Sequence, residues 1–114
     1  MKGLTKLAPF VPEEIRGSYA ALGHEAVIAH LVELGVNAVE LLPIHAIATE
    51  KFLRLQDMTN YWGYSSVGFF APHLGYASPA ALAAGPDAVV AELRGAVDAL
   101  HAAGISVLLD VVYN

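Results

Sequence analysis

The chain has 114 residues, which is enough for one small domain with a modest hydrophobic core. Its net charge is −5 with only six Lys and Arg residues, so it lacks the basic surface that nucleic-acid binding needs. The absence of cysteine excludes disulfides and thiolate metal sites. No segment reaches the roughly 20 apolar residues that span a bilayer, and the N-terminus lacks a secretory signal, so we expect no membrane partner and a cytoplasmic location.

Hydrophobic residues make up 56% of the chain and charged residues 15%, against roughly 45–50% and 25% in ordinary soluble domains. Much of the excess is alanine, which suits helices packed against a sheet. The rest lies in short Val, Leu and Ile runs typical of parallel strands covered on both faces. A free-standing domain of this size would need more polar surface, so the composition indicates an excerpt from a larger domain.

The N-terminal part predicts a loop followed by one helix and one strand. Residues 1–24 are rich in Gly and Pro and read as a loop. Apolar residues within 27–34 follow the spacing of an amphipathic helix, and Gly35 suits the left-handed position just past its end. A strand is expected over Ala38–Leu42, with Glu40 in its middle more consistent with a structural pairing than with catalysis.

A long connection over residues 44–85 follows this strand. Connections of this length are uncommon in compact domains and are usually functional, and this one leaves the carboxyl end of a strand, where α/β folds place their sites. Its aromatic run suits the apolar faces of sugars and consists of Tyr61, Trp62, Tyr64, Phe69 and Phe70. For Phe69 and Phe70 we expect packing within the loop, whereas Tyr64 is equally compatible with packing and with an exposed binding role.

The second half repeats the helix–glycine–strand pattern 69 residues later, with Gly104 in the place of Gly35. Pro86 opens the second helix in the position that proline favours, and a strand is expected over Ser106–Val112. Such units in series favour parallel strands joined by right-handed crossovers. The fold class is therefore α/β, and periodicity alone does not decide between an open sheet and a barrel.

Asp110 is the sharpest chemical signal, because it lies near the end of an apolar strand. A carboxylate there needs hydrogen bonds or a cationic partner, so either a structural or a catalytic role is open. The five histidines show no metal-ligand spacing. Of these, His30 and His101 are expected on helices at or near the surface. No phosphate-binding glycine motif follows either strand, so a nucleotide site is not supported.

Four stretches together resemble the glycogen debranching branch of the α-amylase superfamily. They are KGLTKLAPFVPEEIRGSYAALGH, LGVNAVELLPIHA, NYWGYSSVGFFAP and AAGISVLLDVVYN, in family order and at roughly family spacing. The last resembles the start of the superfamily signature Asp-Val-Val-x-Asn-His, through Asp110, Val111, Val112 and Asn114. The signature histidine would be the next residue.

This resemblance implies that residues 1–114 form the N-terminal portion of an incomplete catalytic (β/α)8 barrel, with strands two and three and helices one and two. Tyr64 matches the tyrosine that stacks on the sugar at the scission point. Asp110 matches an aspartate that holds the polar network of the site, typically with an arginine beside the nucleophile. Asn114 matches the asparagine that shapes the following loop and binds calcium in members that carry it. No catalytic residue is expected here, because the nucleophile and the acid/base lie on later strands.

The implied reaction is retaining hydrolysis of α-1,6 branch linkages in glycogen or a related α-glucan, by two carboxylates about 5 Å apart. The partners implied are the glucan and the rest of the barrel, and no cofactor or metal is expected in this portion. The chain alone should be inactive, because catalysis needs the whole preorganised site. Alternatives are another superfamily enzyme, such as a branching enzyme or a trehalose-releasing hydrolase, a glucan-binding remnant without catalysis, or a truncated product that self-associates through its strand edges.

Overall fold

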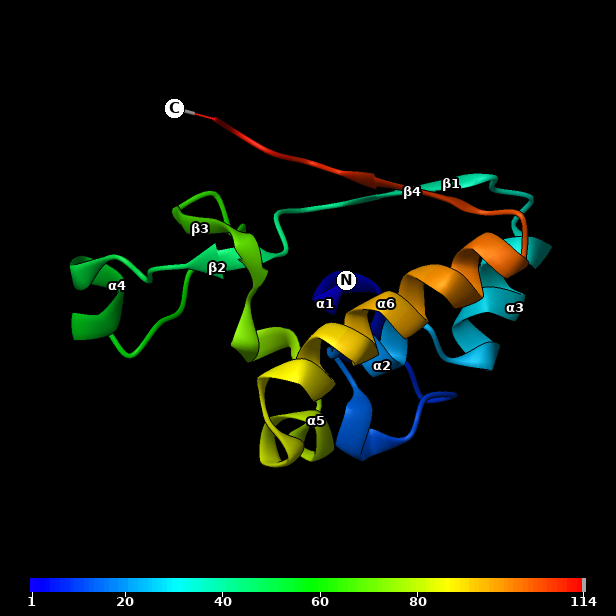
Figure 1. Ribbon diagram of the computed structural model, residues 1–114, viewed down its shortest axis with the longest axis horizontal. Helices are drawn as coiled ribbons and strands as arrows, with labels where there is room; N and C mark the ends of the chain where they lie inside the picture. Colours follow the sequence, from blue (N-terminus) through cyan, green and yellow to red (C-terminus); the bar gives the residue numbers. More distant parts are fainter. Residues whose placement is uncertain (114) are drawn as a thin grey trace.

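The computed structural model describes residues 1–113 as a mixed α/β fold with two small sheets (Figure 1). In chain order its elements are α1 (Lys2–Thr5), η1 (Glu13–Ile15), α2 (Tyr19–Leu22), α3 (Glu25–Glu33), β1 (Ala38–Leu41), β2 (His45–Ile47), α4 (Lys51–Leu55), β3 (Ser66–Pro72), η2 (Leu74–Tyr76), α5 (Pro79–Ala84), α6 (Pro86–Ala102) and β4 (Ser106–Leu109).

The expected parallel pair is confirmed. Strands β1 and β4 run parallel, with Ala38 opposite Ser106 and Leu41 opposite Leu109. Both strands end earlier than predicted, at Leu41 and Leu109 rather than at 42 and 112. One further backbone bond, from Asp110 N–H to the Leu41 carbonyl at 2.9 Å, closes the ladder. Asp110 therefore lies just past the strand, at the carboxyl edge of the pair.

Both helix–strand junctions turn at the predicted glycines. Gly35 has φ +75° and Gly104 has φ +76°, a left-handed conformation that costs glycine little. At the second junction, Gly104 N–H donates to His101 and Ile105 N–H donates to Leu100, each at 2.9 Å. These bonds satisfy carbonyls at the end of α6. Each strand therefore starts at a fixed angle from the helix before it.

The hydrophobic core lies between the helices and one face of the β1–β4 pair. Helix α6 contacts α2, α5 and β4, and Figure 1 shows it running beneath the strand pair. The fully buried large side chains include Tyr19, Leu22, Val27, Val89, Leu100 and Ile105. Gly23 allows α2 to approach α6 closely, since a Cβ there would lie 2.7 Å from the Ala96 Cα.

Two regions that were read as loops contain regular structure. Residues 1–24 form two short helices and a 3₁₀ turn. The long connection contains an antiparallel pair, with His45 opposite Pro72 and Ile47 opposite Ser66. The register of this pair shifts on both sides of Ala46, so the alternation that would have revealed it is broken. The aromatic run therefore ends in strand β3.

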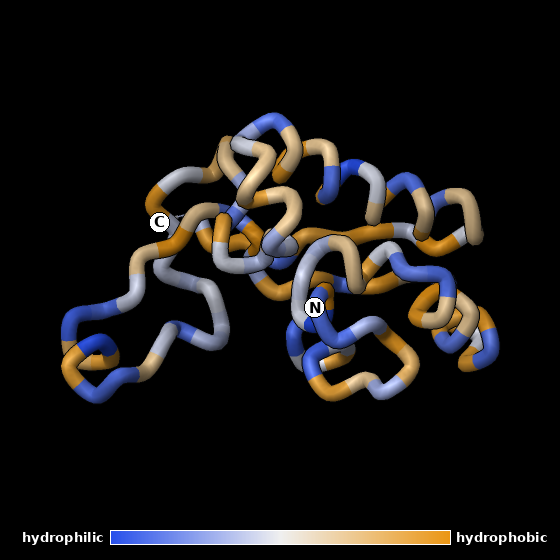
Figure 2. Tube along the Cα trace, turned by 90° about the horizontal axis from the view of Figure 1, so that it is seen from below, coloured by the Kyte–Doolittle hydropathy of each residue, from blue (hydrophilic) through white to orange (hydrophobic). Residues whose placement is uncertain are grey.

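The molecule has a compact helical side and a projecting end. The β2–β3 pair and α4 extend to the left in Figure 1, away from α3. Figure 2 shows hydrophilic and hydrophobic residues alternating at this projecting end, while the β1–β4 pair is hydrophobic along most of its length. Among residues 1–113, no helix combines the length and the apolar character needed to cross a membrane.

Candidate functional site

Two of the predicted site residues meet at the carboxyl edge of the parallel pair. The Tyr64 hydroxyl donates a hydrogen bond to the Asp110 carboxylate. Tyr64 comes from the turn before β3 and Asp110 follows β4, so the contact joins segments 46 residues apart. Asp110 is half-buried and Tyr64 is 41% exposed. The ring of Tyr64 is therefore held at a fixed point while part of its surface faces solvent.

The site is electrostatically negative. The hydrogen bond to Asp110 raises the pKa of the Tyr64 phenol above its ordinary value, and the charge of Glu40 adds to the increase. Glu40 lies exposed on β1, opposite Leu108, and Asp110 is two residues beyond Leu108. Because side chains alternate along a strand, Glu40, Leu108 and Asp110 belong to the same face, the one turned away from α6. A neutral Tyr64 phenol is the form that this arrangement favours.

The turn that carries Tyr64 depends on the glycine before it. Gly63 is buried with φ +88°, and a Cβ there would lie 2.9 Å from the Pro43 carbonyl oxygen. The Gly63 N–H donates to the Asn60 side-chain oxygen at 2.8 Å, which closes the first part, residues 60–63, of a turn that runs over residues 60–65. The backbone entering Tyr64 is therefore fixed against the segment that follows β1.

A polar cluster that sequence reasoning missed supports the same turn. The Glu50 carboxylate accepts hydrogen bonds from the Asn60 side-chain amide at 3.0 and 3.1 Å and from the Ser65 hydroxyl. We call Glu50, Asn60 and Ser65 the Glu50 cluster. Asn60 carried a local signal, because type I turns favour asparagine at their first position and glycine at their fourth. Glu50 carried none, since its partners are 10 and 15 residues away.

The base of the β2–β3 pair is anchored to the helical core by Tyr19. The buried Tyr19 hydroxyl lies 3.1 Å from the Ile44 carbonyl oxygen and 3.0 Å from that of His73. His73 N–H in turn donates to the Ile44 carbonyl at 2.8 Å. Burial raises the pKa of Tyr19, so it is a neutral donor under ordinary conditions. The segments at Ile44 and His73, which flank the β2–β3 pair, are thus linked to each other at its base.

The remaining aromatic residues divide into packed and exposed groups. Phe69 is half-buried, with ring centroids 5.6 Å from His45 and 4.9 Å from Tyr113, so the packing role expected for it is confirmed. The same expectation for Phe70 is wrong, since its side chain is fully exposed on β3. Tyr61 and Trp62 are also exposed and stack edge to face at 5.6 Å. Exposed aromatic side chains therefore lie on both sides of Tyr64 along the sequence.

The other predicted residues have simple outcomes. Asn114, expected to support the site, lies outside the described residues. His30 and His101 lie on α3 and α6 and are half-buried and exposed, respectively, as expected. Among residues 1–113, no group of three His, Cys, Asp or Glu side chains could hold a metal ion.

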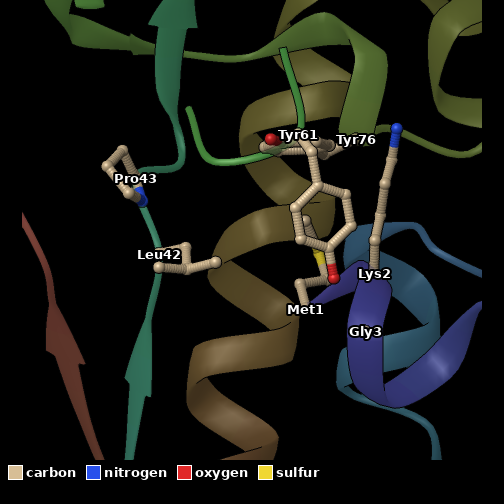
Figure 3. Close-up of a pocket in the computed structure, with 7 residues that line it drawn as sticks. All are labelled: Met1, Lys2, Gly3, Leu42, Pro43, Tyr61 and Tyr76. Atoms are coloured by element: carbon tan, nitrogen blue, oxygen red, sulfur yellow. The ribbon is translucent and has the colours of Figure 1, made fainter. Parts of the chain in front are cut away.

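The cavities lie apart from the Tyr64–Asp110 contact. Figure 3 shows one pocket between α1, the end of β1 and the rings of Tyr61 and Tyr76. Its volume is about 20 Å³, which is room for a single water molecule. A larger apolar hollow of about 300 Å³ lies between α6 and β4, lined in part by Leu93, Val97 and Leu109. Neither is lined by Tyr64 or Asp110, so the site is an open edge rather than an enclosed cavity.

Comparison with a solved structure identifies the class of protein to which the fold belongs. The chain superposes on a pullulanase from Anoxybacillus sp. LM18-11, determined in complex with maltotetraose, with a TM-score of 0.72 and 26% sequence identity. The match covers 99% of this chain and 17% of the pullulanase chain. The fold is thus that of one part of an α-amylase-like glycoside hydrolase. No protein-family model matches the chain.

Curated relatives identify a narrower group within the glycoside hydrolases. The glycogen debranching enzyme of Klebsiella pneumoniae subsp. pneumoniae is 50% identical over 114 residues, and that of Salmonella typhi is 47% identical over the same length. The chain is therefore a homologue of bacterial glycogen debranching enzymes, which are glycoside hydrolases. Each match covers 100% of this chain and 16% of the relative, so the chain spans about one sixth of the length of these relatives.

Proposed function

We propose that this chain forms part of the catalytic domain of an enzyme that hydrolyses α-1,6 branch linkages in glycogen or a related α-glucan. The similarity to glycogen debranching enzymes over the whole chain supports the substrate class. The pullulanase neighbour was determined with a bound α-glucan, maltotetraose. The proposal includes a complete (β/α)8 barrel, of which the β1–β4 pair supplies two adjacent parallel strands.

The observation that carries this proposal is the contact between Tyr64 and Asp110. A partly exposed tyrosine ring can stack on the apolar face of a sugar. Its hydroxyl is fixed by a carboxylate at the edge of the sheet where barrel enzymes place their sites. In the proposed site, Tyr64 binds a glucosyl unit, and Asp110 fixes Tyr64 and contributes to the polar network.

The proposed reaction is retaining hydrolysis. One carboxylate attacks the anomeric carbon and forms a glycosyl-enzyme intermediate. A second carboxyl group protonates the leaving oxygen and then activates water, at about 5 Å from the first. We assign neither carboxylate to residues 1–114. This chain would supply binding and positioning, and we expect the 114-residue polypeptide alone to be inactive. A cytoplasmic location is part of the proposal and is supported by the similarity to bacterial glycogen debranching enzymes.

The test is a product analysis with the intact natural protein that contains this chain. Glycogen and a branched limit dextrin are incubated with the protein, and the products are separated by anion-exchange chromatography. The proposal predicts release of short linear malto-oligosaccharides and loss of α-1,6 anomeric proton signals. A rise in α-1,6 signals would indicate a branching enzyme, and release of trehalose would indicate the trehalose-forming alternative. Either result would contradict the proposal.

The exposed aromatic rings favour one second candidate, glucan binding without hydrolysis. Tyr61, Trp62 and Tyr64 are 57%, 61% and 41% exposed, and such rings can hold sugars without any catalytic group. Affinity electrophoresis in gels containing glycogen separates the two functions. A binder is retarded by glycogen and leaves it unshortened, whereas a hydrolase changes the chain-length profile.

A further inference from the structure

We propose that Glu50 is a positioning residue for Tyr64, acting through Asn60 and Ser65 to hold the tyrosine ring where a glucosyl unit can stack on it. The inference rests on the proposed function for the role of Tyr64. It concerns residues to which neither the motif resemblance nor the Tyr64–Asp110 contact assigns a role.

The Glu50 cluster binds both ends of the turn that carries Tyr64. Asn60 begins the turn, and its amide group donates to both oxygens of the Glu50 carboxylate at 3.0 and 3.1 Å. Ser65 ends the turn, and its hydroxyl donates to Glu50 Oε1. The Asn60 amide nitrogen also lies 3.2 Å from the Ser65 hydroxyl oxygen. One carboxylate therefore fixes the distance between the residues on either side of Tyr64.

The same cluster controls the backbone inside the turn. The second polar atom of Asn60, its side-chain oxygen, accepts from Gly63 N–H at 2.8 Å. Asn60 thus connects Glu50 to the residue directly before Tyr64. On the other side, Ala48 N–H donates to the Ser65 carbonyl at 3.0 Å, which ties the turn to the chain leading into Glu50. Movement of Glu50 would therefore be transmitted to Tyr64 through two independent connections.

The contacts call for a carboxylate rather than an amide at position 50. Within the cluster Glu50 acts only as a hydrogen-bond acceptor, and its donors are the Asn60 amide and the Ser65 hydroxyl. The bond from Ser65 is the main cause that lowers the pKa of Glu50, and the bond from Asn60 acts in the same direction. A glutamine would place an N–H₂ group against one of these donors. Glu50→Gln is thus a nearly isosteric way to weaken the cluster.

A double-mutant cycle tests whether Glu50 acts through Tyr64. Branch-cleavage kinetics are measured for the intact protein, Glu50→Gln, Tyr64→Ala and the double variant, with Glu33→Gln on an exposed helix position as the control. We expect Glu50→Gln to lower kcat/KM roughly tenfold in the wild-type background, because small misplacements of binding groups are costly. In the Tyr64→Ala background the same change should cost less than about twofold. Equal losses in both backgrounds would overturn the proposal.

A spectroscopic measurement decides the same question without activity. Trp62 lies inside the turn, between Asn60 and Gly63, and its indole is 61% exposed. In protein labelled with 5-fluorotryptophan, its ¹⁹F resonance is assigned by its loss in Trp62→Phe. We expect Glu50→Gln and Ser65→Ala to shift or broaden this resonance and Glu33→Gln to leave it unchanged, with the melting temperature of each variant measured as a folding check.

The two measurements separate this inference from the proposed function. If the wild-type protein leaves branch linkages intact, the proposed function fails, and the ¹⁹F spectra still decide whether Glu50 fixes the turn. If branches are cleaved but Glu50→Gln lowers kcat/KM by the same factor in the wild-type and Tyr64→Ala backgrounds, the proposed function stands and the positioning role is refuted. An unchanged Trp62 resonance in both Glu50→Gln and Ser65→Ala would refute it as well.

Discussion

In the contact between Tyr64 and Asp110, the phenol is the hydrogen-bond donor and the carboxylate is the acceptor. The hydroxyl of Tyr64 donates, so the phenol must stay neutral while the carboxylate is charged. Because the folded-state pKa of Tyr64 is raised, the contact stabilises the fold fully below the ordinary tyrosine pKa of about 10. That contribution is lost as the pH rises through the higher folded-state pKa.

We therefore predict that Asp110→Asn lowers the pKa of Tyr64 toward its ordinary value. Asparagine accepts a hydrogen bond but carries no charge, so the phenolate is no longer opposed by a neighbouring anion. Glu40→Gln should lower the pKa in the same direction by a smaller amount, since Glu40 is the weaker cause. The measurement is the ¹³Cζ chemical shift of Tyr64 against pH. Identical midpoints in the wild type and Asp110→Asn would contradict the contact.

The separate residues of this site could be predicted from the sequence, but their arrangement could not. Tyr64 and Asp110 are predicted from their local settings, and the family resemblance adds their roles, but nothing in the sequence alone indicates that their side chains touch across 46 residues. The prediction that Asp110 needs a polar partner was physically sound, and Tyr64 is a partner that the described residues provide. Glu50 was missed because a partly exposed glutamate in a polar segment has no distinguishing pattern.

At the scale of elements, the turn before β3 is determined by backbone geometry. Gly63 combines a left-handed φ of +88° with an approach of 2.9 Å between a built Cβ and the Pro43 carbonyl oxygen. Gly35 has a similar φ of +75° with no atom within 4 Å. Substitution of Gly35 therefore measures the free-energy cost of the left-handed conformation alone. Substitution of Gly63 measures that cost together with the cost of the close contact.

We predict that Gly63→Ala destabilises the protein more than Gly35→Ala does. A left-handed alanine costs about 1–2 kcal/mol, which is the expected effect at Gly35. At Gly63 the collision with Pro43 adds about 1–3 kcal/mol and displaces Tyr64. Urea unfolding monitored by circular dichroism gives both values. Equal destabilisation would mean that the turn relaxes freely and does not fix Tyr64.

Elements with strong periodicity and glycine ends were predictable, and the β2–β3 pair was not. The helix before Gly35 and the helix that begins at Pro86 both form as expected, because apolar spacing and end signals agree. Strand β2 has three residues, and its register with β3 shifts twice, so no alternation marks it. The early ends of β1 and β4 reflect pairing, since hydrogen bonds to a partner define a strand and an apolar run does not.

At the scale of the whole molecule, an apolar surface is exposed beside the parallel pair. Leu108 is 54% exposed and Leu109 45% exposed on β4, and Val112 and Tyr113 beyond it are also exposed. Parallel strands are ordinarily buried on both faces. Part of the high apolar content that predicts an excerpt from a larger domain is thus exposed on and beyond β4, which supports the proposed barrel.

We predict that a polypeptide of these 114 residues, produced alone, self-associates. Exposed strand edges with apolar side chains pair readily with other chains. Its weight-average sedimentation coefficient should rise with concentration, and Leu108→Lys together with Leu109→Lys should reduce the rise. A monodisperse monomer at about 100 µM would contradict this expectation and would show that the exposed face needs no cover.

The fold class was predictable because two helix–glycine–strand units repeat in one chain, and repetition fixes strand direction. The closure of a barrel was not, since two strands leave curvature and strand number open. The resemblance to debranching enzymes is confirmed by the 47% and 50% identities, and the closed barrel that it implies remains part of the proposal.

We propose that Tyr64 and Asp110 support α-1,6 branch cleavage, and steady-state kinetics of Asp110→Asn in the intact protein test this role most directly. With a branched dextrin as substrate, we expect kcat to fall at least roughly tenfold, as when one preorganised polar group is removed from an active site. The circular dichroism spectrum should not change. Wild-type kinetics in Asp110→Asn would show that this edge of the parallel pair has no part in the reaction.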